Sequence, residues 1–269
     1  MAETVSAAVA DSRELSAAAG FVWLATGLGV LHPYFRAEGR PYLERLGLPD
    51  WLMYAACAIE VVLGLRVMLG PARGWLAAVQ VVAIAGFTLV LALLEPKLLV
   101  SPFGVLSKNG TLVAVILAAW LLEREGWTPL TTWTLRLGLA FIWVWEGLFA
   151  NFLFQDQAVR DVIAKARLPV GDVGLFLKVA GVGEVLGGLA ILVLRGQPLR
   201  WLLALQAFGL LVITALVTNY ELRFWFHPFG PLTKNVPLIL GTVILLRRTP
   251  AADGPAPPAT PPGRAAGPR

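Results

Sequence analysis

Hydrophobic residues along this chain are gathered into eight long runs separated by short polar segments. The runs cover residues 15–32, 52–69, 74–94, 109–122, 134–153, 174–194, 200–219 and 234–247. A helix needs about 20 residues to cross the hydrocarbon core of a bilayer, and six of the runs come close to that length. The runs at 109–122 and 234–247 have only 14 residues each. The pattern predicts an all-α membrane protein with eight transmembrane helices, of which the fourth and eighth begin part-way into the membrane.

The same nine-residue phrase stands at the start of both short runs. Residues 101–109 read SPFGVLSKN, and residues 227–235 read HPFGPLTKN. Further matches extend the repeat: Trp75 with Trp201, Gln80 with Gln206 and Glu95 with Glu221 at an offset of 126, Glu60 with Glu184 at 124, and Trp23 with Trp143 and Gly27 with Gly147 at 120. The chain is therefore interpreted as a duplicated unit.

The number of helices per unit predicts how the two units are related. Four helices is an even number, so both units enter the membrane from the same side and are parallel, with a pseudo-twofold axis along the membrane normal. We expect residues 1–14 to form a polar tail, 15–124 the first repeat and 134–248 the second. Residues 249–269 contain seven prolines and no apolar periodicity, which predicts a disordered tail.

A longer amphipathic connection follows the first and the fifth run. In the second unit the apolar positions are Val159, Val162, Ile163 and Ala166. Their spacing gives one apolar face, as in a helix that lies in the membrane interface. Tyr42, Leu43 and Leu46 suggest a shorter equivalent in the first unit. Both segments are expected at the membrane face that carries the two copies of the phrase.

Composition supports the membrane interpretation and excludes several functions. The chain is 57% hydrophobic and 14% charged, whereas soluble domains have about 25% charged residues. Its net charge of +5 is scattered at the ends of the runs, without the basic stripe that a nucleic-acid partner requires. Cys57 is the one cysteine. An intrachain disulfide, dithiol chemistry and a cysteine-rich metal or iron–sulfur site are therefore excluded.

Basic residues at the short links indicate the orientation. Lysine and arginine divide equally between the two sides, but the compact basic links are Arg66 with Arg73, Arg195 with Arg200, and Arg247 with Arg248. Placing these links inside the cell puts both termini in the cytoplasm. The protein is expected to be a multi-pass protein of the cell membrane. The first 14 residues lack the basic start of a cleavable signal, so the first run is expected to stay as a helix.

Three carboxylates lie in the middle of hydrophobic runs. A charge at the bilayer centre costs at least about 2.5 to 3.5 kcal/mol, so such residues face protein or water and are candidates for function. Glu60 and Glu184 occupy matched positions, whereas Glu146 matches Thr26 and breaks the symmetry. All three are catalytic candidates. The alternative is a structural contact with Gln80, Gln206 or a tryptophan N–H.

The repeated phrase supplies the candidate ligand-binding residues. Lys108 and Lys234 stand at helix starts, where the helix dipole disfavours a cation, so each is expected to pair with an acid or an anionic ligand. Candidate acids are Glu95, Glu221 or a buried carboxylate. The binding candidates are Lys108, Asn109, His227, Lys234 and Asn235; a clamp that holds the fold is the alternative. His227 and His32 are not equivalents, and neither haem nor a metal site is expected.

Several of these features together resemble the DoxX-like membrane family. The resemblance is carried by Glu60, Glu184, residues 102–109 and 228–235, and the Trp-containing first helix of each unit. It extends over residues 15–248, once in each unit, and implies an integral protein of the bacterial inner membrane. Some relatives are membrane subunits of quinone-linked oxidoreductases that act on thiosulfate. Others carry a fused nucleotide-binding dehydrogenase domain, which this sequence lacks.

The expected function follows from the buried charges and this resemblance. The first hypothesis is a membrane subunit of a quinone-linked oxidoreductase system, with a soluble or membrane redox partner. It binds a quinone or lipid-like molecule near the phrase, the acids handle protons, and the lysines hold the head group. The second is a non-enzymatic carrier of small solutes or a membrane assembly factor. In a third, the acids and lysines only hold the bundle together. Whether the chain is itself an enzyme stays open.

Overall fold

The computed structural model describes residues 2–100, 105–155 and 157–250, and its regular structure there is entirely helical. The α-helices are α1 (Ala2–Gly29), α2 (Pro33–Arg45), α3 (Trp51–Leu69), α4 (Gly74–Leu94), α5 (Val105–Glu125), α6 (Pro129–Trp145), α7 (Gln157–Lys165), α8 (Val173–Val193), α9 (Gly196–Tyr220) and α10 (Asn235–Arg248). Three other helical segments join them: the 3-10 helices η1 (Pro96–Leu99) and η3 (Leu222–Phe226), and the π-helix η2 (Glu146–Phe154).

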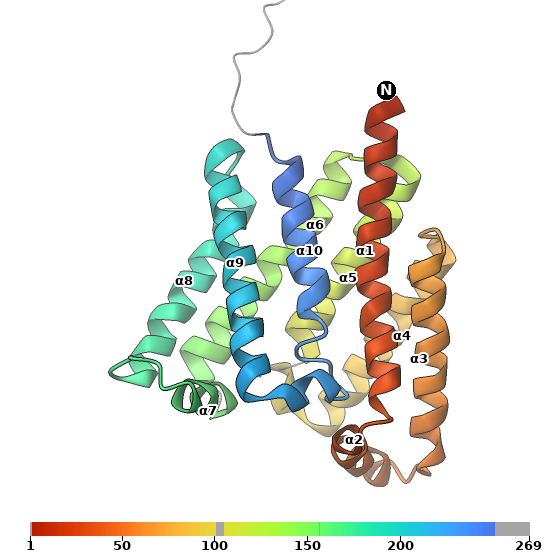
Figure 1. Ribbon diagram of the computed structural model, residues 1–269, viewed down its shortest axis with the longest axis vertical. Coiled ribbons are helices and arrows are strands. Elements are labelled where there is room, and N and C mark those ends of the chain that lie inside the picture. Colours follow the sequence, from red (N-terminus) through yellow and green to blue (C-terminus); the bar gives the residue numbers. More distant parts are fainter. Residues whose placement is uncertain (1, 101–104, 156, 251–269) are drawn as a thin grey trace, which may run out of the picture.

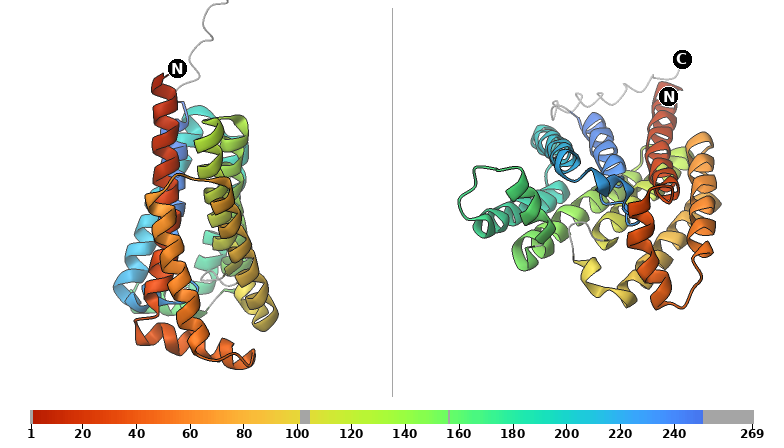
Figure 2. Two further views of the ribbon diagram at one scale, coloured as in Figure 1. Left: turned by 90° about the vertical axis from the view of Figure 1, so that its right-hand side faces the viewer. Right: turned by 60° about the horizontal axis from the view of Figure 1, so that its bottom comes forward.

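The long helices form a bundle in which successive helices run in opposite directions (Figure 1). The turns α3–α4, α5–α6 and α8–α9 lie at the end that holds the N-terminus, which we call the upper end. The short helices α2 and α7 both lie at the opposite, lower end. In side view the bundle is narrower, with α1, α9 and α10 on one side and α5 and α6 on the other (Figure 2, left).

Six helical segments are long and apolar enough to cross a membrane: α3, α4, α5, α6 with η2, α8 and α9. A seventh is counted if α1 and α2, which are bent by 87° at their junction, form one span. The helix of the last predicted crossing, α10, has 14 residues and is about 21 Å long, shorter than the ~30 Å hydrocarbon core. By length and composition, then, six or seven of the described helices qualify as spans.

The outer surfaces of these helices are apolar, as a bilayer requires. Leu69 on α3, Leu93 on α4 and Val193 on α8 are 85%, 75% and 73% exposed. Large exposed apolar surfaces of this extent are unfavourable in water. The helices therefore present this surface to lipid.

The centre of the bundle is made by α5 and α10, the fourth helices of the two predicted units. In α5, 72% of the apolar window is buried, compared with 22% in α3 and α4. The expectation of a short fourth helix was wrong, because α5 begins at Val105 and has 21 residues. Ser107 and Lys108 are polar but buried within its first turns, so hydropathy placed the start of the helix too late.

Equivalent glycines bring the first two spans of each unit into close contact. A Cβ atom added to Gly27 would lie 2.6 Å from the backbone oxygen of Cys57, and one added to Gly147 would lie 2.6 Å from that of Gly181. Cys57 and Gly181 differ by 124 positions, the same offset as Glu60 and Glu184. The two units thus repeat one helix contact as well as one sequence.

The N-terminal segment belongs to the first helix. Residues 2–14, expected to form a polar tail, extend α1. Ser12 Oγ donates to the backbone oxygen of Ala119 at 2.8 Å, while Trp127 and Arg248 both donate to Asp11 Oδ2, at 2.8 and 2.7 Å. These partners from α5, the α5–α6 turn and α10 explain how a polar segment is packed. Of the predicted tail 249–269, residues 251–269 lie outside the described residues.

The amphipathic segments are helices, but α7 turns its apolar face toward the protein. Val162 is buried with Val217 of α9 and with Leu232, so this face does not lie on lipid as expected. The equivalent helix α2 has 13 residues and α7 nine. The first-unit segment is therefore the longer of the two, contrary to the prediction.

Candidate functional site

A cavity of about 420 Å³ lies between α1, α2, α3, α4 and α5. Pro228, Phe229 and Lys234, from the second copy of the phrase, also line it. Its volume lies within the range of about 300 to 1,000 Å³ that is typical of small-molecule sites. The first unit therefore supplies most of the cavity, and the second unit supplies a cation and a turn.

Most of the cavity lining is apolar, and most of its polar groups already have partners. Trp23 Nε1 donates to Gln80 Oε1 at 3.0 Å. Asn109 Nδ2 donates to Thr88 Oγ1 at 2.8 Å. These bonds fix α1 and α5 against α4. The other polar groups of the lining include the carboxyl of Glu60, the hydroxyl of Tyr42 and the amine of Lys234.

Glu60 has a buried oxygen atom without a partner. Its Oε2 makes no hydrogen bond within the described residues, although buried polar atoms in proteins are almost always hydrogen-bonded. The charge that acts on this carboxyl is that of Lys234, whose Nζ donates to the backbone oxygen of Phe229 at 2.6 Å. An acceptor and a cation thus meet at one apolar cavity, where they can bind the polar head of an otherwise apolar molecule.

Glu146 begins the π-helix η2, which continues directly from α6. Ser107 Oγ donates to Glu146 Oε1 at 2.9 Å, and the charge of Lys108 acts on the same carboxyl. π-helical turns are rare and frequently occur at functional sites. Hydrophobic periodicity gave no signal for this segment, which the sequence pattern treated as the end of an ordinary helix.

Each lysine of the phrase reaches into the other half of the chain. Lys108, which is 5% exposed, donates through Nζ to the backbone oxygen of Pro231 and to Asn235 Oδ1, the latter at 2.9 Å. Lys234 in turn faces Glu60 of the first unit. The two lysines are therefore exchanged between the units.

Two acids proposed as lysine partners bind other residues. Glu95 pairs with Arg45 at 3.2 Å. Glu221 pairs with Lys165 and with Arg223, the latter at 2.8 Å. The prediction of Glu95 and Glu221 was thus wrong, because basic residues on α2, α7 and η3, which the sequence did not place in space, are closer to them.

Five ionisable groups, of which the two lysines are buried and the three glutamates half-buried, connect the two units. Each group acts electrostatically on the next along the row Glu60, Lys234, Lys108, Glu146 and Glu184. Three carboxyls and two amines are balanced in charge when one carboxyl carries a proton.

The two ends of this row differ in their hydrogen bonds. Asn151 Nδ2 donates to Glu184 Oε2 at 2.7 Å, whereas Oε2 of Glu60 has no described partner. Contacts with Gln80 or Gln206 were the structural alternative that the sequence left open for these acids. Gln80 instead binds Trp23, and Gln206 Oε1 is buried with no partner in the described part of the chain.

Asn109 and Asn235 make equivalent contacts in the two units. Asn109 bonds to Thr88, and Asn235 Nδ2 donates to Thr214 Oγ1 at 2.9 Å. Thr88 and Thr214 differ by 126 positions. The asparagines thus connect each fourth helix to the third helix of its own unit.

His227 holds a turn next to the cavity. Its Nδ1 accepts a hydrogen bond from the backbone N–H of Phe229 at 3.2 Å. Burial, together with the positive charges of Lys234 and Arg223, lowers the pKa of His227 from 6.5 to about 4, so the ring is neutral at pH 7. Across the described residues, no group of three His, Cys, Asp or Glu side chains could hold a metal ion.

Comparison with known proteins gives one match. The sequence model of the DoxX-like family matches residues 20–117 and again residues 140–243. The two matches start 120 positions apart and end 126 positions apart, the offsets found within the sequence itself. No curated protein and no solved structure matches the chain.

Proposed function

Because this chain belongs to the DoxX-like family and is a polytopic membrane protein, we propose that it binds a quinone in the cavity beside Glu60 and Lys234. In this proposal it acts as the membrane subunit of a quinone-linked oxidoreductase system. The observation that carries the proposal is the unpartnered carboxyl oxygen of Glu60 at a mostly apolar cavity.

The chemistry of a quinone suits this arrangement. Its isoprenoid tail is apolar and matches side chains such as Leu52, Phe87 and Leu91 of the lining. Its carbonyl oxygens accept hydrogen bonds from Lys234 or from a protonated Glu60. Reduction to the quinol takes two electrons and two protons. The electrons come from a redox partner, and the row that ends at Glu60 supplies or relays protons.

The proposal includes an arrangement in the bilayer. All eight predicted helices cross the membrane of the cell, and both units enter from the side of the upper end. That end carries the basic links, from Arg66 and Arg73 to Arg247 and Arg248, so it faces the cytoplasm. Although α10 is short, the turn of residues 227–234 extends the crossing at its lower end. Non-helical backbone is tolerated there because the neighbouring helices shield it from lipid. Units 15–124 and 134–248 are the proposed domains.

Binding of decylubiquinone to the purified protein in detergent tests the proposal. The variant Glu60→Gln removes the charge at the cavity, and Glu184→Gln is its matched control, because Glu184 is equivalent in sequence but does not line the cavity. We expect Glu60→Gln to weaken binding about tenfold, which corresponds to a loss of about 1.4 kcal/mol of binding free energy. Glu184→Gln should leave the affinity unchanged. Quenching of tryptophan fluorescence reports binding.

Equal affinity in wild type and both variants would contradict the site. Quinone reduction in membranes is the second readout, and Lys234→Met should abolish it under the redox hypothesis. Binding that depends on Glu60 without any quinone-dependent electron transfer would favour the alternative, a non-enzymatic carrier or assembly factor.

A further inference from the structure

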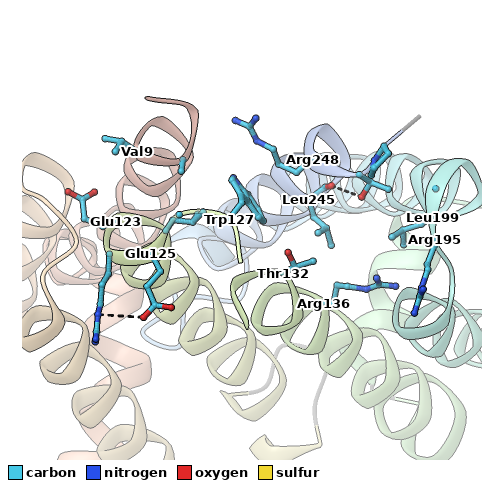
Figure 3. Close-up of a pocket in the computed structure, with 17 residues that line it drawn as sticks. Val9, Glu123, Glu125, Trp127, Thr132, Arg136, Arg195, Leu199, Leu245 and Arg248 are labelled. Atoms are coloured by element: carbon cyan, nitrogen blue, oxygen red, sulfur yellow. Dashed lines mark hydrogen bonds and ion pairs between the residues drawn. The ribbon is translucent and has the colours of Figure 1, made fainter. Parts of the chain in front are cut away.

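A second, larger cavity of about 930 Å³ lies at the upper end of the molecule. The first turns of α1, the α5–α6 turn, the start of α9 and the end of α10 surround it (Figure 3). None of the candidate residues from the sequence lines it. The quinone proposal gives it no role.

Arg136 of α6 is fixed at one side of this cavity. Its side chain is buried, with the residue 8% exposed. Its Nε and Nη2 donate to the backbone oxygen of Ile191, and Nη2 also donates to that of Leu194 at 2.5 Å. These carbonyls at the end of α8 hold the guanidinium in place. Nη1 takes no part in these bonds and is available to a ligand.

A second guanidinium lies beside the first without an acid to balance it. Figure 3 shows Arg195 next to Arg136, with Glu123 and Glu125 on the far side of the cavity. The charge of Arg195 acts directly on Arg136. No hydrogen bond or ion pair joins the Arg195 side chain to another described residue. Arg195 is exposed, so solvent screens part of the repulsion between the two guanidinium groups, and an anion bound between them would be attracted by both.

The start of α9 adds to the positive field at this place. Arg195 is the N-cap residue of α9, and no side chain caps the helix. The free N–H groups and the dipole of a helix N-terminus favour an anion. Three positive sources therefore converge: two guanidinium groups and the start of a 25-residue helix.

We propose that Arg136 and Arg195 form a binding site for a phosphate group, carried either by an anionic phospholipid or by a soluble phosphate ester. Arginine forms paired hydrogen bonds with phosphate oxygens. Beyond the arginines the cavity is lined by Leu122, Leu199 and Leu245, which can contact the glycerol and acyl portion of a lipid.

The first unit offers an internal comparison. At the equivalent place, Ser16 stands where the second unit has Arg136, and the space between Ser16 and Arg73 is only about 10 Å³. Arg73 is nevertheless the exposed N-cap residue of α4, again without a side-chain cap. It shares with Arg195 its charge and its place as the N-cap residue of a helix, but it lacks both the cavity and the second guanidinium.

The test uses the full-length protein in a neutral detergent and measures its thermal unfolding. The probes are dioleoylphosphatidylglycerol, dioleoylphosphatidylcholine and glycerol 1-phosphate. We expect phosphatidylglycerol to raise the melting temperature of the wild type more than phosphatidylcholine does. Arg195→Gln should raise the phosphatidylglycerol concentration needed for half of this shift about tenfold. Arg73→Gln, the matched control, should not change it.

The outcomes separate the two sources and can overturn the site. Stabilisation by glycerol 1-phosphate that Arg195→Gln removes would identify a soluble ester as the ligand. Equal responses of Arg195→Gln and Arg73→Gln, or no stabilisation by either phosphate probe, would overturn the proposal. Glu60→Gln should respond like the wild type, so this result is independent of quinone binding.

Discussion

At equivalent positions of the two units, single residues give Glu60 and Glu184 different surroundings. Asn151 bonds to Glu184, but the residue 120 positions earlier is Leu31, which cannot donate a side-chain hydrogen bond. In the same way Trp23 bonds to Gln80, while Trp143 Nε1 has no partner among the described residues. Side-chain differences of this size decide which unit keeps a polar group free.

The half-buried imidazole of His227 leads to a prediction about acid stability. Its folded pKa is about 4, below the ordinary value of 6.5. As the pH falls from 6.5 toward 4, the unfolded chain takes up a proton that the folded chain does not, so the free energy of unfolding decreases. We expect His227→Asn, which keeps an acceptor near the Nδ1 position, to lose less stability than the wild type across this interval.

Thermal unfolding in detergent between pH 7.5 and pH 4.5 measures this difference. Near pH 7.5 the melting temperatures of the wild type and the variant should change with pH in the same way, and they should diverge as the pH falls. Parallel curves over the whole interval would show that His227 does not contribute.

At the scale of helices, the sequence predicted the elements well and their local geometry less well. The eight apolar runs correspond to α1, α3, α4, α5, α6 with η2, α8, α9 and α10. One difference between the units has a visible cause: Pro33 follows the end of α1, whereas its counterpart Leu153 lets the helix after α6 continue to Phe154. The i→i+5 hydrogen bonding that makes η2 a π-helix leaves no trace in hydropathy.

The glycine contact between η2 and α8 gives a prediction with a control on the same helix. A Cβ at Gly181 would lie 2.4 Å from the backbone oxygen of Gly147, whereas one at Gly183 would meet no atom within 4 Å. Gly181→Ala should therefore destabilise the protein by about 1 to 3 kcal/mol, as overpacking does. Gly183→Ala should be neutral or slightly stabilising, since alanine favours helices.

Thermal unfolding of the two variants under identical conditions makes the comparison. A loss of stability in Gly183→Ala as large as in Gly181→Ala would show that α8 is sensitive to any side chain, and would contradict the close contact.

Across the whole molecule, the candidate site could be predicted in its members but not in its pairings. Glu60, Lys234 and Asn109, singled out by sequence, line one cavity. The sequence could not show that Lys234 lies near Glu60 of the first unit and Lys108 near Glu146 of the second. Contacts between residues more than 120 positions apart depend on how the units dock. Arg136 was missed because a charged residue near the beginning of an apolar run is usually solvated.

The exchanged lysines predict a dependence between the two units. Lys108→Met leaves the carboxyl of Glu146 without its cation and the backbone oxygen of Pro231 without its donor. A charge left inside a protein without a compensating charge nearby is strongly destabilising. We expect little folded protein from Lys108→Met and partial recovery when Glu146→Gln is added, because the second change removes the unbalanced charge.

The yield of monodisperse protein in detergent, with both single variants and the double variant, completes this cycle. If the double variant accumulates no better than Lys108→Met alone, Lys108 stabilises the protein only through its bonds to Pro231 and Asn235 in the second copy of the phrase.

The lysine exchange also bears on how such a chain arose. Since the cation at the cavity of the first unit comes from the phrase of the second, a single unit alone would need a second copy of itself to complete the cavity. Joining the two units in one chain supplies this second copy permanently. Residues that stand in one unit alone, such as Glu146 and Arg136, then need no match in the other.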